Sequence, residues 1–205
     1  MAPNPFLRLL TPLLIAAILA AITLAAGAQT GPRELLSSGR SAATFGSYGV
    51  SVLEQNAALR VSSLFSGAAE QRTCRTFALV RYAESIDPSL ATEHAAIVAG
   101  GSIGAVLAAQ GWEVRKTHLY YGERRASGRL ASLMRIAVGT PLAEHVYVLD
   151  VVKDGRAIEY AALVEIHHPD YLSLADLETI YGAPNTASLR ELVTTLLTTA
   201  TERAR

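Results

Sequence analysis

The sequence predicts an α+β domain in which an antiparallel sheet of about six or seven strands packs around one long apolar helix, followed by C-terminal helices. Apolar and polar residues alternate over several short stretches, which is typical of strands with one buried face. Asp154-Gly155 separates two of these stretches and is a strong signal for a two-residue hairpin turn. Residues 95–109, AAIVAGGSIGAVLAA, contain a single polar side chain and therefore predict a helix that protein covers on all sides.

The composition is that of a folded domain without a strongly charged surface. Half of the 205 residues are apolar and 18% are charged. Lysine and arginine together number 18, as do aspartate and glutamate, and no long block of like charge occurs. We therefore expect no nucleic acid among the partners and no polybasic patch for a membrane surface.

The N-terminus has the three parts of a secretory signal peptide. Arg8 precedes a mainly apolar run from Leu9 to Ala26, and Ala26-Gly27-Ala28 provides small residues for a signal peptidase. The sequence predicts a signal peptide over residues 1–28 that is cleaved or kept as an N-terminal anchor. The protein would then be periplasmic or secreted, with no other contact with the membrane.

After this segment we expect a linker over residues 29–44 and a single α+β domain over residues 45–205. Asp87-Pro88 favours the start of a helix at about residue 88, and Gly111 favours its end at about residue 110. Ser188 and Glu191 form a capping-box pattern at the start of the last helix. Residues 173–181 are expected to be helical, and residues 130–138 fit either a strand or a helix. The predicted strands are 45–54, 59–65, 76–82, 114–125, 144–152 and 156–166.

The glycine run resembles one motif of the dinucleotide-binding Rossmann proteins. Gly100, Gly101 and Gly104 are the residues that would let backbone amides approach a pyrophosphate. Ala99 replaces the first glycine of that motif, and hairpins follow it where the Rossmann fold needs βα units. A packed helix with close contacts is the favoured interpretation, and no cofactor is predicted.

Residues 75–166, a strand, a long helix and antiparallel strands, are similar in layout to the hotdog fold. This resemblance implies acyl-thioester chemistry and a carboxylate near the central helix. Glu93 is the residue that could fill this role, with His94 beside it. A pocket lined by Glu93 would support an enzyme, whereas solid packing around it would contradict one.

Glu165 and His167 are the residues whose spacing suits a metal. They lie two positions apart on a predicted strand and so share a face. Two ligands do not complete a site, and the sequence identifies no third, so no metal is predicted.

Because the sequence assembles no catalytic constellation, it predicts an exported, non-catalytic binding or envelope accessory protein. The alternative is a hotdog-like hydrolase acting through Glu93 and His94. A protein partner or self-association stays open, because the last helix has a threonine-rich polar side.

Overall fold

The computed structural model describes residues 37–185 and 190–205. Its centre is one antiparallel sheet of six strands in the order β1-β2-β3-β6-β5-β4. The strands are β1 Gly49–Gln55, β2 Leu59–Ser66, β3 Thr73–Tyr82, β4 Glu113–Arg125, β5 Pro141–Lys153 and β6 Arg156–His167.

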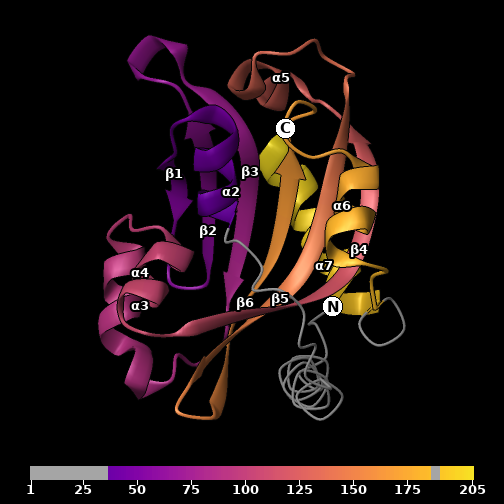
Figure 1. Ribbon diagram of the computed structural model, residues 1–205. Coiled ribbons are helices and arrows are strands. Elements are labelled where there is room, and N and C mark those ends of the chain that lie inside the picture. Colours follow the sequence, from indigo (N-terminus) through magenta and orange to yellow (C-terminus); the bar gives the residue numbers. More distant parts are fainter. Residues whose placement is uncertain (1–36, 186–189) are drawn as a thin grey trace, which may run out of the picture.

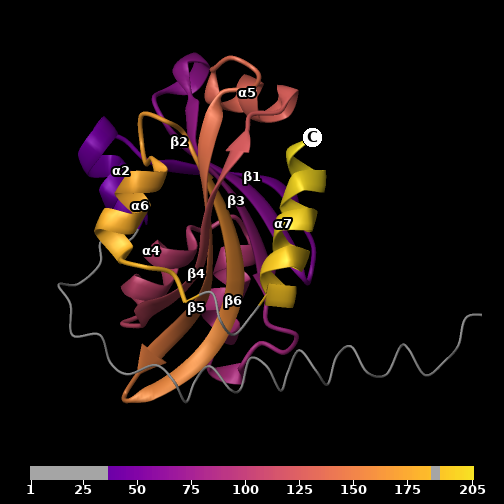
Figure 2. The same cartoon turned by 90° about the vertical axis from the view of Figure 1, so that its right-hand side faces the viewer.

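Helices cover both faces of this sheet (Figures 1 and 2). Helix α7 packs on one face, whereas α2, α4 and α6 lie on the other. Helix α5 lies near one end of the strands, beside the loop between β2 and β3. The helices are α2 Ser37–Phe45, α3 Ala91–Val98, α4 Ile103–Ala109, α5 Gly128–Met134, α6 Leu174–Tyr181 and α7 Arg190–Ala204, with 3₁₀ turns at Ala69–Gln71 and Pro88–Leu90.

The period of two in the strands produces three hydrophobic clusters. Val164 and Ile166 of β6 face α5 and α7 in the largest cluster, together with Leu196 of α7. On the opposite face, one cluster lies under α3 and α4 and contains Leu163. A second, smaller cluster on that face lies under α2 and α6 and is centred on Leu177.

The prediction of one long helix over residues 88–110 is wrong. Helix α3 ends at Val98 and α4 begins at Ile103. Gly100 has φ +111°, its N–H donates to the carbonyl of Ile97, and the N–H of Gly101 donates to that of Ala96. These two hydrogen bonds with glycine in the positive-φ position form a Schellman ending. The glycines therefore end a helix, and the predicted helical contact surface does not form.

Other sequence predictions agree with the structure at the level of the elements. The class is α+β with an antiparallel sheet, and Asp154-Gly155 connects β5 to β6. Gly111 ends α4 with φ +78°. Residues 128–134 are helical, which decides between the two alternatives considered for 130–138. One difference is that residues 37–45, which include the end of the expected linker over residues 29–44, form the helix α2.

The hotdog-like layout is not observed. That fold needs one long helix wrapped by the sheet, whereas α3 and α4 have eight and seven residues and are separated by a turn. The signal peptide over residues 1–28, the linker residues before 37, and Ser188 of the capping box lie outside the described residues. Within the described ranges, no helix combines the length and the apolar character needed to cross a bilayer.

Gly101→Ala should destabilise the protein. A Cβ at this position would lie 2.7 Å from Val106 Cγ2 and 2.8 Å from the backbone oxygen of Ala96. Because the backbone oxygen cannot rotate away, we expect a loss of about 1–3 kcal/mol in the free energy of unfolding, measured by urea denaturation.

Gly128→Ala is the matched control for this substitution. It adds a Cβ in the first turn of α5, where no atom outside the adjacent residues and the local helix backbone lies within 4 Å. The free energy of unfolding should therefore change by less than about 0.5 kcal/mol or rise slightly. Equal destabilisation by the two alanines would contradict the close packing at the α3–α4 turn.

Candidate functional site

Polar side chains cross the face of the sheet between its two smaller hydrophobic clusters. We call this set the polar belt; it comprises Arg60, Ser62, Thr76, Lys116, His118, His145, Glu165 and His167. Strand pairing aligns Ser62 with Ala78, Ala78 with Glu165, and Glu165 with His145. Arg60, His145, Glu165 and His167 are all at most 4% exposed. Buried polar groups need partners, so such a belt costs stability unless it is hydrogen-bonded or binds something.

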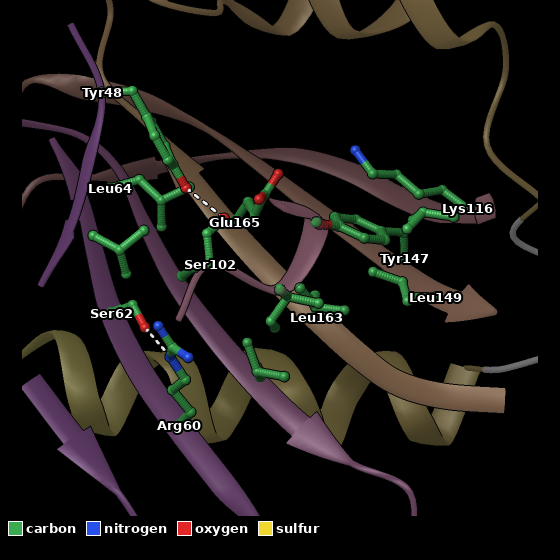
Figure 3. A pocket seen from close by; sticks show the side chains of 16 residues that line it. Tyr48, Arg60, Ser62, Leu64, Ser102, Lys116, Tyr147, Leu149, Leu163 and Glu165 are labelled. Carbon is green, nitrogen blue, oxygen red and sulfur yellow. Dashed lines mark hydrogen bonds between the residues drawn. The ribbon is translucent and has the colours of Figure 1, made fainter. Parts of the chain in front are cut away.

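A pocket opens over one end of the polar belt (Figure 3). Its cavity volume is about 70 Å³, which is enough for several water molecules because each needs about 10–15 Å³ by this measure. Ser102, the residue before α4, contributes to the wall, and its hydroxyl is 3.1 Å from the hydroxyl of Tyr48, the residue before β1. Lys116 and Glu165 line the wall formed by β4 and β6.

Arg60 supports the pocket from below α3 and α4. Its Nη1 donates to the carbonyl oxygens of Ile97 and Gly101 at 2.8 and 2.9 Å, and its Nε donates to Ser62 Oγ at 2.7 Å. The guanidinium thus donates a hydrogen bond to the carbonyl of Ile97 at the C-terminal end of α3, where a positive charge is favourable. No carboxylate of the described residues forms an ion pair with it.

His145, Glu165 and His167 form a compact cluster within the polar belt. One potential ligand atom from each lies within 4.8 Å of the others, and His167 Nε2 is 3.8 Å from Glu165 Oε2. Burial lowers the pKa of His167 to about 3, with a smaller contribution from the charge of Lys116. The imidazole is therefore neutral at pH 7, and its contact with Glu165 is not an ion pair.

The two buried imidazoles are held by neighbours on adjacent strands. Thr76 Oγ1 is 3.1 Å from His167 Nδ1, and His118 Nδ1 is 2.8 Å from His145 Nε2. The His145 ring also stacks with Tyr181 of α6 at a centroid distance of 5.2 Å. These contacts fix the orientation of both rings.

Glu93 and His94, the residues suggested for catalysis, lie away from the pocket. Glu93 is buried and accepts a hydrogen bond from the indole N–H of Trp112 at 2.9 Å. His94 Nδ1 is 3.0 Å from the Tyr160 hydroxyl. Neither residue lines the pocket. Both act as partners for aromatic residues in the packing under α3, which argues against the hydrolase.

The three glycines suggested for a phosphate loop are separated by the structure. Gly100 and Gly101 form the end of α3, whereas Gly104 lies in α4 and lines the pocket. The sheet is antiparallel throughout, so the βα unit that a dinucleotide site needs is absent from the described part of the chain.

Sequence reasoning found Glu165 and His167 but missed their neighbours. The structure adds His145 to the cluster and Arg60 and Lys116 to the pocket. A sequence signal existed for His145, because the Asp154-Gly155 hairpin places its strand beside that of Glu165. The pairing of these two residues, however, depends on a bulge between Leu149 and Asp150.

Comparisons with known proteins return structures only. No family model matches the sequence, and no curated protein matches it. The PhnF C-terminal domain is 17% identical, with 67% of this chain and 78% of that one covered and a TM-score of 0.39. A GntR-family transcriptional regulator from Enterococcus faecalis V583 is 12% identical, with 62% and 93% covered and a TM-score of 0.35. The C-terminal domain of Yurk from Bacillus subtilis is 16% identical, with 62% and 89% covered and a TM-score of 0.36.

Four sequence predictions disagree with the descriptions of these neighbours. Of four matched structures, those from Enterococcus faecalis and Streptomyces coelicolor are described as transcriptional regulators, and none of the four is described as an envelope protein or a hydrolase. The four are the exported accessory protein with its hydrolase alternative, the signal peptide, the periplasmic or secreted location and the absence of nucleic acid among the partners; these predictions are withdrawn. Because every TM-score lies below 0.5, the likeness transfers no function to this chain.

The neutral buried histidines should make stability depend on pH. Burial lowers the pKa of His145 well below its ordinary value and that of His167 to about 3. The unfolded chain protonates histidine near pH 6.5, so the free energy of unfolding falls as the pH drops from about 6.5 toward 3. Each histidine should contribute a loss of about 1.4 kcal/mol between pH 7.5 and pH 5.5.

Urea denaturation at these two pH values, with a chelator present, measures this effect. His167→Gln should reduce the pH-dependent loss by about the share of one histidine, whereas His94→Gln, which replaces a less buried ring, should reduce it less. A loss that is the same in His167→Gln and in the unsubstituted protein would show that His167 is not held neutral by burial.

Proposed function

We propose that this chain is a small-molecule-binding domain whose pocket takes a small anionic ligand such as a carboxylate. The observation that carries the proposal is the charge of the pocket wall. Among the lining residues are the guanidinium of Arg60, the ammonium of Lys116 and the carboxyl group of Glu165, that is, two basic side chains and one acidic one. An anion entering the pocket therefore gains more attraction than repulsion.

Arg60 makes this preference strong because its charge is desolvated. The residue is 2% exposed, and its described partners are carbonyl and hydroxyl oxygens. A buried charge without a counter-ion is costly, and a bound anion offsets part of that cost. The Arg60 guanidinium therefore attracts the anion by its electric charge and not mainly by direct hydrogen bonds, since two of its nitrogens already donate to protein groups.

The rest of the wall suits a short organic acid. The Ser62 hydroxyl, and whichever of the Tyr48 and Ser102 hydroxyls accepts their mutual hydrogen bond, can donate to an anion. Aliphatic side chains such as Val80 and Ile103 cover an apolar part of the wall. A few polar groups on an otherwise apolar wall are typical of small-molecule sites. The cavity volume of about 70 Å³ limits the ligand to a few heavy atoms in the present conformation.

Lys116 is the side chain that tests the proposal. Its ammonium lies 4.8 Å from the centre of the Tyr147 ring, at the pocket wall. Acetate, malonate and inorganic phosphate should raise the melting temperature, because a ligand that binds only the folded state stabilises it by mass action. Choline chloride at the same ionic strength controls for salt. Lys116→Met should weaken the binding of the best anion about tenfold or more, equivalent to about 1.4 kcal/mol.

Lys153→Met is the matched control variant. Lys153 also lies over an aromatic ring, that of Trp112, but it lines no part of this pocket. Its removal should leave anion binding unchanged. The proposal is overturned if none of the anions shifts the melting temperature more than choline chloride does, or if the two methionine variants weaken binding equally.

A further inference from the structure

Two buried imidazole nitrogens of the polar belt have no hydrogen-bond partner among the described residues. They are His145 Nδ1 and His167 Nε2, on rings that are 0% and 1% exposed. An unsatisfied buried nitrogen costs stability, and here two occur in one cluster with a carboxylate. Such a coincidence calls for a physical explanation.

The other nitrogen of each ring lies within hydrogen-bond distance of a neighbouring side chain. His167 Nδ1 is next to Thr76 Oγ1, and His145 Nε2 is next to His118 Nδ1, at 3.1 and 2.8 Å. Metal-bound histidines show this arrangement: one nitrogen faces the ion, while the other donates its proton to a neighbouring group that fixes the ring. Thr76 Oγ1 and His118 Nδ1 can each accept a hydrogen bond from such an N–H group.

We propose that His145 Nδ1, His167 Nε2 and a carboxylate oxygen of Glu165 bind a divalent transition-metal ion of the Zn²⁺ class. Two imidazoles and one carboxylate are a common donor set for Zn²⁺ and related ions. The inference goes beyond the anion pocket and does not rest on it, because it depends on three other contacts. Glu165 belongs to both sites, so the ion lies next to the pocket wall.

The spacing of the three side chains fits this assignment after a small adjustment. Metal–ligand bonds of about 2.0–2.2 Å place two ligand atoms roughly 3.5 Å apart in a tetrahedral site. His167 Nε2 and Glu165 Oε2 are already 3.8 Å apart, and one potential ligand atom from each of the three residues lies within 4.8 Å of the others. Small movements of the side chains within the cluster close the remaining gap.

Lys116 is the group that opposes a cation here. Its charge acts on both His145 and His167, and it therefore repels a metal ion as well. This gives the two sites opposite responses to one substitution: Lys116→Met removes an attractive charge for an anion but a repulsive charge for a metal.

The test uses the full chain without an affinity tag, stripped with a chelator and titrated with Co²⁺ and Zn²⁺ alone. We expect one equivalent of Co²⁺ to bind with visible d–d absorption bands, and Zn²⁺ to displace it. Glu165→Gln and His167→Gln should each weaken Co²⁺ binding at least tenfold. His94→Gln is the matched control, since that ring is paired with Tyr160 outside the cluster, and its affinity should be unchanged. Near-ultraviolet circular dichroism verifies that each variant is folded.

Lys116→Met distinguishes the failure of this inference from the failure of the anion pocket. It should tighten Co²⁺ binding several-fold while it weakens anion binding. The inference is overturned if the folded, stripped protein binds no Co²⁺ at millimolar concentration, or if Glu165→Gln and His167→Gln bind it as tightly as His94→Gln does. In either case a buried water molecule would be the partner of the two nitrogens.

Discussion

The contact between the Arg60 guanidinium and the carbonyl oxygens of Ile97 and Gly101 organises the polar face of the sheet. It anchors the end of α3 to β2 and so fixes where α4 begins. Ser102, the residue before α4, is thereby brought against Tyr48, and the pocket wall is complete. One buried charge thus joins the central strands to the segment that shapes the site, at a desolvation cost that three hydrogen bonds offset in part.

The two faces of the sheet differ in how they are packed. The face under α5 and α7 is a continuous hydrophobic core, which can be built from any well-fitting aliphatic side chains. On the other face the apolar residues form two clusters, and the polar belt lies between them. Natural cores rarely keep such a belt without a reason, because each buried polar group needs a partner. A ligand and an ion are partners of the right charge for its two ends.

The register of the β5–β6 hairpin explains why the sequence predicted only part of the site. A two-residue turn at Asp154-Gly155 without a bulge would pair Glu165 with Glu144. The irregularity between Leu149 and Asp150 shifts the pairing by one residue, so that Glu165 meets His145 instead. Since a shift of one residue moves every side chain to the other face, local pattern cannot decide which partners meet. For the same reason the sequence did not identify Arg60, whose two carbonyl partners are 37 and 41 residues away.

The sequence by itself determined the elements: the α+β class, the antiparallel strands and their turns, the helix stop at Gly111 and the shared face of Glu165 and His167. These depend on periods of 2 and 3.6 residues and on turn residues, which are local properties. Only the tertiary structure decided that the glycine run is broken at Gly100, that the face carrying Glu165 is buried, and that His145 completes its cluster. Burial and pairing depend on what the rest of the chain places over a residue, and a local pattern does not contain that information.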